Sequence, residues 1–391
     1  ACLIPPGMLG HDPGRRAQSF TNEEARKVLD SSGLELPLRL KASAHPLIQD
    51  RYGSLLTDLL STWSEIGVDI SSETSDINDY LKSWKDNEGL DLTIGRWNAD
   101  YNDPDNFTFT LFHSDAGGLR RYFSSDESDR ILEAARSAAE PKTRERAYRR
   151  FENLLDETRA LVPLFHDVDY RLAGPRVTQL KLRGSAPYVN YQEIGRRDLS
   201  KTDREVRSTA RGTIQVPIAG AVHSLDPNTS DTVEQGEAVP SIYECLLHAK
   251  GGTRMVPWLA AEFKAEKGGR VYRFRLRDDV RFHDGRRLTV RDVRSSFERI
   301  LQNQECKDRW FMAPIRGAKE VLDGKAKDLS GFRIHSATEF SMELEEPVGF
   351  FPALVAWQVT AIIPEGSDPQ HDKQWIGTGP FRVVNFEPGK R

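Results

Sequence analysis

The sequence predicts an α/β fold with mixed sheets in more than one domain, and three observations support this prediction. The length of 391 residues allows two or more domains with sizeable cores. Along residues 36–97, strand-like alternation and helix-like periodicity of apolar residues follow one another. Strand-like alternation then returns beyond residue 257, again next to a helical pattern. Helices and strands that alternate in this way pack as α/β layers.

The first part of the chain shows the clearest alternation of elements. Residues 36–42 alternate small or apolar residues with proline, arginine and lysine, as a half-buried strand does. Residues 52–66 carry apolar side chains at helical spacing, and Gly67 ends that helix. The expected order is a helix at 21–33, a strand at 36–42, a helix at 52–66, a strand at 68–70, a helix at 77–84 and a strand at 91–97. This order predicts crossover connections between the strands.

The middle and the second half of the chain are expected to differ in order and charge. Residues 196–212 are highly charged and lack apolar periodicity, so we interpret them as a linker. The other expected elements are charged helices at 128–139 and 142–160, an extended segment at 161–172, a strand at 213–218, a short helix at 241–247, a hairpin at 257–277, a capped helix from residue 289 and a strand at 340–344.

Composition and motifs exclude several classes of protein. Charged residues make up 29% of the chain but the net charge is only −4, so neither a nucleic-acid-binding surface nor an acidic tail is indicated. No apolar run is long enough to cross a bilayer, and no signal-peptide pattern is visible. The cysteines Cys2, Cys245 and Cys306 have no CxxC spacing, and the nine histidines include no HExxH pair. We therefore expect no metal site and no cofactor.

One stretch, residues 91–107, carries the candidate binding chemistry. It is expected to be a short strand that ends in a polar turn containing Pro104. Asp100 lies there between Trp97 and Tyr101, and a carboxylate beside aromatic faces can hold a cationic group such as an amine. The alternative is that Asp100 only caps amides of the turn, as Asp103 also could. Physical chemistry alone favours this alternative.

The string GRWNADYNDPDNF at residues 95–107 resembles the signature of the dipeptide- and oligopeptide-binding proteins, the family 5 solute-binding components of ABC importers. In that family the aspartate after the tryptophan binds the α-ammonium of a peptide. The resemblance therefore implies that Asp100 binds a ligand ammonium and that Trp97 lines the pocket, with Arg96 and Tyr101 beside them. It also implies a two-lobed type II periplasmic-binding-protein fold, the Venus-flytrap architecture.

The second half resembles the same family, but its blocks come in an unexpected order. They are YRFRLR and VRFHDG at residues 272–285, their continuation to residue 299, and IGTGPF at residues 376–381. In the family these blocks precede the tryptophan–aspartate motif, whereas here they follow it. We interpret residues 1–195 as the C-terminal part of such a protein, 196–212 as a linker and 213–391 as the N-terminal part.

This order has two explanations, a junction between tandem copies and a circular permutant. A middle segment of the family pattern is missing, and the chain stops inside a strand pattern. We therefore expect the two-lobed fold to be incomplete.

The resemblance implies a non-enzymatic receptor of an ABC importer that closes on a peptide or similar amine-bearing solute and presents it to a membrane permease. The backbone of Gly220, Ala221, Val222 and His223 is expected to face the ligand, and an ordinary strand end is the equally weighted alternative. The expected location is the periplasm or the cell exterior, with or without a membrane anchor. No nucleic-acid partner is expected.

A second hypothesis is a ligand-sensing module of a larger regulatory protein, because solute-binding domains are also fused to DNA-binding or kinase domains. An enzyme is disfavoured, since no GxSxG, P-loop, HExxH or paired-carboxylate motif stands out. Gly377-Thr-Gly379 lacks the Lys-Ser/Thr pair of a phosphate loop and is expected to form a tight turn.

Overall fold

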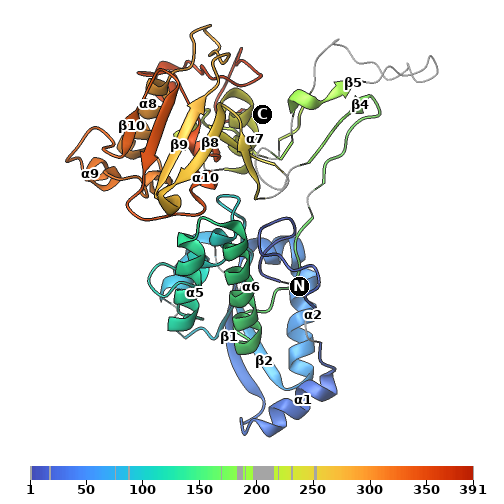
Figure 1. The fold of residues 1–391 in the computed structure, drawn as a ribbon. Coiled ribbons are helices and arrows are strands. Elements are labelled where there is room, and N and C mark those ends of the chain that lie inside the picture. The colour runs from blue at the N-terminus through green and yellow to red at the C-terminus, as the bar shows by residue number, and fades with distance from the viewer. Residues whose placement is uncertain are drawn as a thin grey trace.

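The structure, a computed structural model, forms two bodies that are joined by a long extended arm (Figure 1). It describes residues 2–16, 19–74, 76–86, 89–168, 170–182, 188–189, 191–196, 215–218, 220–229, 232–250 and 253–390. Within these residues, no helix is both long and apolar enough to span a membrane.

The first body contains a three-stranded parallel sheet in the order β2-β1-β3. Leu38 pairs with Val68 and Ala42 with Leu92, and helix α2 packs against β2. The elements are α1 (Asn22–Ser31), β1 (Leu38–Ala44), α2 (Pro46–Glu65), β2 (Val68–Thr74), α3 (Ile77–Asp86) and β3 (Leu92–Ile94). The predicted order of elements and the crossover connections are confirmed. Helix α1 buries none of its side chains, and Val28 is 59% exposed.

Two charged helices complete the first body. They are α5 (Asp126–Ser137) and α6 (Pro141–Thr158), which pack against each other and follow the short helix α4 (Phe109–Phe112). Their inner faces bury Leu132 and Phe151 beside Phe112, while their charged residues mostly face solvent. Both helices lie within one or two residues of the positions that the sequence predicts.

The second body contains a four-stranded antiparallel sheet in the order β10-β11-β9-β8. Phe274 of β9 stacks on Phe340 of β11, and Phe340 stacks on Phe332 of β10. The elements are α7 (Val233–Ile242), β6 (Leu247–Ala249), β7 (Met255–Pro257), β8 (Ala260–Glu266), β9 (Val271–Leu276), α8 (Val290–Gln302), α9 (Ala318–Leu322), β10 (Phe332–Ile334), β11 (Glu339–Glu343), α10 (Phe351–Leu354) and α11 (Pro369–Asp372). With a parallel sheet in one body and an antiparallel sheet in the other, the predicted α/β class is confirmed.

The arm leaves the first body after α6 and reaches the second body, where it carries β4 (Val177–Thr178) and β5 (Gly195–Arg196) (Figure 1). Its predicted extended segment is present, and Leu172 is 93% exposed. The arm is fixed to α7 at Glu237, which pairs with Arg171 at 3.1 Å and accepts a hydrogen bond from the Tyr191 hydroxyl at 3.2 Å.

Two predicted elements of the second half differ from the structure. The helix expected at 241–247 begins earlier, because Thr232 and Gln235 form a capping box, and it ends at Ile242. Of the strand expected at 213–218, residues 215–218 form no strand, and the first two residues lie outside the described part. The linker expected at 196–212 also lies outside it, except for Arg196.

The two bodies contact each other through aromatic rings and backbone. Tyr101 of the first body is completely buried in the core of the second, stacked on Phe350 with ring centroids 5.4 Å apart. Arg136 of α5 lies over the same Phe350 ring, 5.0 Å from its centroid. The Arg136 carbonyl accepts a hydrogen bond from the Gly349 amide at 2.8 Å. Ring packing on Phe350 and a backbone hydrogen bond at the adjacent Gly349 therefore join the two bodies at one place.

Candidate functional site

The polar turn after β3 is organised by Asn106, which is completely buried in the 3₁₀ helix at Pro104–Phe107. Its side-chain oxygen accepts hydrogen bonds from Trp97 Nε1 at 2.8 Å and from the Asp100 amide at 3.1 Å. Its Nδ2 donates to Asp100 Oδ2 at 3.1 Å. One amide side chain thus fixes both predicted ligand residues. Asn106 was not among the predicted site residues, although it lies inside the motif.

Asp100 carries an accessible carboxylate at this turn. Its side chain is exposed, and it forms no ion pair with any residue that the structure describes. Even so, the surrounding protein atoms desolvate it enough to raise the pKa of the carboxyl, and the hydrogen bond from Asn106 only partly opposes this. A carboxylate that is desolvated without a cation can gain from binding one.

The neighbouring aspartates have structural partners and differ from Asp100. Asp103 accepts a hydrogen bond from the Asp105 amide at 3.0 Å, so it caps the turn as the alternative hypothesis proposes. It also receives two hydrogen bonds from the Arg144 guanidinium. The Asp100 carboxylate accepts a hydrogen bond from the Asn106 side chain instead. It therefore does not cap a backbone amide as Asp103 does.

The other predicted residues of the motif are placed differently. Tyr101 is buried between the two bodies, and its hydroxyl donates to Asp105 Oδ2 at 2.6 Å. Its ring is therefore part of the core and does not line a surface beside Asp100. Arg96 is half-buried, and its Nη2 donates to Asn98 Oδ1 at 2.8 Å.

The segment Gly220–His223 precedes α7 in the sequence. In space it lies in the second body, next to the start of α7 and to Gly389 near the end of the described chain. A side chain at Gly220 would meet the Glu234 carboxylate, with Oε1 only 2.6 Å from the Cβ position. The Val222 carbonyl accepts a hydrogen bond from the Gly389 amide at 3.0 Å, and His223 is exposed. Val222 and Trp97 pack against different hydrophobic clusters, so the two predicted groups have separate surroundings.

Metal and thiol chemistry have little basis in the part of the chain that the structure describes. No group of three or more histidine, cysteine, aspartate or glutamate residues there could hold a metal ion. The three cysteines are free and buried. Burial raises the pKa of the Cys245 thiol to about 12, which keeps it protonated and unreactive at neutral pH.

Asp105 gives a pH-dependent prediction. It is buried, and desolvation raises the pKa of its carboxyl despite Arg136 at 3.4 Å. An acid whose folded pKa is above its unfolded pKa binds its proton more tightly in the folded state. We therefore expect wild type to gain stability relative to Asp105→Asn as the pH falls through the folded pKa towards the unfolded pKa, measured by urea unfolding.

Glu262 is the control for this experiment, because Arg275 lowers the pKa of its carboxyl. Wild type should therefore lose stability relative to Glu262→Gln as the pH falls, the opposite of the change expected for Asp105→Asn. A pH-independent difference between wild type and Asp105→Asn would contradict the prediction.

Comparison with known proteins finds relatives for part of the chain. Residues 254–391 match the family described as bacterial extracellular solute-binding proteins, family 5, middle region. The periplasmic oligopeptide-binding protein OppA of Salmonella typhimurium is 27% identical over 162 residues, which cover 41% of this chain and 30% of OppA. The periplasmic murein peptide-binding protein MppA of Escherichia coli is 28% identical over 177 residues, covering 41% of this chain and 32% of MppA. The match thus spans about a third of each relative.

Solved structures show partial similarity to the chain. The unliganded open form of MppA aligns with a TM-score of 0.40 and 24% identity, over 44% of this chain and 35% of MppA. The pheromone receptor PrgZ aligns with a TM-score of 0.41 and 22% identity, over 44% of this chain and 36% of that one. Residues 254–391, about a third of the chain, are thus similar to family 5 of the bacterial extracellular solute-binding proteins.

Proposed function

We propose that the chain is part of a solute-binding component of an ABC importer, acting outside the cytoplasm, which binds peptides or similar amine-bearing solutes. In this proposal residues 1–195 and 213–391 are the C-terminal and N-terminal parts of such a protein. A membrane permease is the partner. The family match and the named peptide-binding relatives support the proposal.

The observation that carries the peptide specificity is the state of Asp100. Its carboxylate is held by Asn106, is exposed, and has no cationic partner among the described residues. Arg144 and Arg136, which pair with the neighbouring Asp103 and Asp105, leave Asp100 available. A ligand ammonium would supply the missing positive charge beside the Trp97 ring. In this proposal, lobe closure brings backbone groups of Gly220, Ala221, Val222 and His223 from the second body towards the ligand.

The proposed contact can be tested by changing either the Asp100 carboxylate or the ammonium group of the peptide. A panel of di- and tripeptides is first screened for an increase in melting temperature of the full chain. The best peptide and its N-acetylated form are then titrated by calorimetry into wild type and Asp100→Asn. We expect either change alone to weaken binding about tenfold or more, because each removes one charge of the pair.

Binding of the N-acetylated peptide to Asp100→Asn should be little weaker than binding with either change alone, because each change already removes the same charge interaction. Asp115→Asn, which alters an exposed loop carboxylate, should bind like wild type. Equal affinity of wild type and Asp100→Asn for the free-amine peptide would remove Asp100 from the site.

A further inference from the structure

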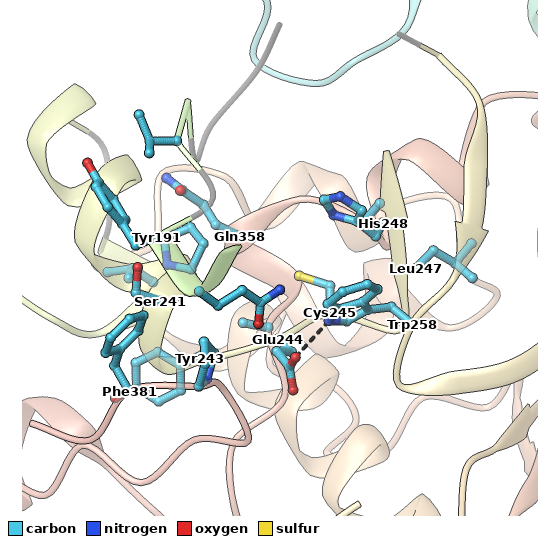
Figure 2. A pocket seen from close by; sticks show the side chains of 17 residues that line it. Tyr191, Ser241, Tyr243, Glu244, Cys245, Leu247, His248, Trp258, Gln358 and Phe381 are labelled. Carbon is cyan, nitrogen blue, oxygen red and sulfur yellow. Dashed lines mark hydrogen bonds between the residues drawn. The ribbon is translucent and has the colours of Figure 1, made fainter. Parts of the chain in front are cut away.

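A hollow lies where the arm meets the second body, at a place that the proposed peptide site does not use. Its lining includes Tyr191 from the arm, Tyr243 and Glu244 after α7, Trp258 before β8, and Phe381 near the end of the described chain (Figure 2). None of the residues at 96–101 or 220–223 lines it. Water could occupy about 80 Å³ of the hollow, which suits a small head group better than a peptide.

The hollow contains one carboxylate, that of Glu244. Glu244 is half-buried, and Trp258 Nε1 donates a hydrogen bond to its Oε1 at 2.7 Å (Figure 2). It forms no ion pair with any described residue, since the nearby Arg277 binds Asp279 through two hydrogen bonds. Desolvation raises the pKa of the Glu244 carboxyl, although hydrogen bonding to Thr378 and Trp258 and the more distant charges of Arg277 and His283 oppose this. The acid is therefore partly desolvated without a counter-charge in contact.

Aromatic rings line the hollow together with this carboxylate. Trp258 and Glu244 are joined by their hydrogen bond, and the His248 ring lies 5.0 Å from the Trp258 ring. The Tyr191 hydroxyl donates to Glu237, so the arm is fixed where its ring lines the hollow. Phe381 is fixed by its amide, which donates to the Ser241 carbonyl at 3.1 Å. Aromatic faces are negative and attract cations, most strongly where water is partly excluded.

We propose that this hollow is a second binding site, which takes a small organic ammonium group between the Glu244 carboxylate and the surrounding aromatic rings. The ammonium donates hydrogen bonds to the Glu244 oxygens, which have acceptor capacity beyond the Trp258 contact. The site is independent of Asp100.

Methylammonium is a suitable probe, and methanol is its neutral counterpart of similar size. The full chain is titrated with methylammonium chloride at constant ionic strength, with sodium chloride as the balancing salt. The indole N–H signal of Trp258 is followed by NMR and assigned with Trp258→Phe. We expect a saturable shift with methylammonium, and neither methanol nor sodium chloride should produce it.

Glu244→Gln retains an acceptor for Trp258 but removes the charge, so it should weaken methylammonium binding about tenfold or more. Glu262→Gln, which changes an exposed glutamate on β8, should bind like wild type, and so should Asp100→Asn. If Glu244→Gln does not fold, Phe381→Leu at the half-exposed rim is expected to weaken binding several-fold.

The absence of a saturable shift, an equal shift with methanol, or unchanged affinity in both Glu244→Gln and Phe381→Leu would overturn the second site. Retained methylammonium binding in Asp100→Asn separates this result from the peptide experiment. Failure of either proposal therefore leaves the other standing.

Discussion

Arg144→Met is expected to lower the free energy of unfolding by about 3–5 kcal/mol, because it leaves the Asp103 carboxylate buried without its counter-charge. Asp103 and Arg144 are 3% and 5% exposed, and the guanidinium binds both carboxylate oxygens. Burial alone would lower the pKa of Arg144, but the Asp103 charge outweighs it and the pKa is raised. Urea unfolding followed by circular dichroism measures the loss.

The double variant Asp103→Asn/Arg144→Met tests this cause. It removes both charges and retains an oxygen that can cap the Asp105 amide. We expect it to be more stable than Arg144→Met alone, because no buried carboxylate is left unpaired. Equal stability of the single and double variants would show that lost packing, and not the unpaired charge, causes the effect.

Gly349→Ala is expected to destabilise the contact between the two bodies by several kcal/mol. A Cβ at this position would lie 2.1 Å from the Ala138 carbonyl oxygen and 3.0 Å from Arg144 Cδ. The first of these is backbone and cannot move without shifting α5, whose Arg136 carbonyl binds the Gly349 amide. Hydrogen exchange measured by mass spectrometry should show loss of protection around Tyr101 and Phe350.

Gly53→Ala is a matched control in α2, at a half-buried position where a Cβ meets no atom within 4 Å. It should leave the protein unchanged or more stable by up to about 1 kcal/mol, because alanine favours the helix. A Gly349→Ala variant with normal protection at Tyr101 would contradict the close approach of the two bodies.

Local patterns predicted most of the elements, because each depends on a few neighbouring residues. The capping box of Thr289 and Asp292 and the alternation around Phe274 lie where the sequence indicates. The predicted helix at 241–247 was wrong, because the apolar run after residue 241 is compatible with a helix but does not form one. The true start of α7, the Thr232 capping box, is a weaker signal.

The candidate site was predicted less completely, because its contacts join residues that sequence spacing does not relate. Asp100 and Trp97 could be chosen from the motif, but the bond network of Asn106 depends on how the turn closes. Tyr101 looked like a ligand residue because it is an aromatic neighbour of Asp100. Its burial against Phe350, about 250 positions away, is a tertiary effect.

The insertion of Tyr101 into the opposite core has a consequence for how the molecule can be divided. A fragment that ends before residue 215 would display the Tyr101 ring to water, and the complementary fragment would lose a filled position beside Phe311 and Phe350. Each fragment would then expose an aromatic hydrophobic patch to solvent and be prone to aggregation. Co-expression of the two fragments should restore solubility that neither has alone.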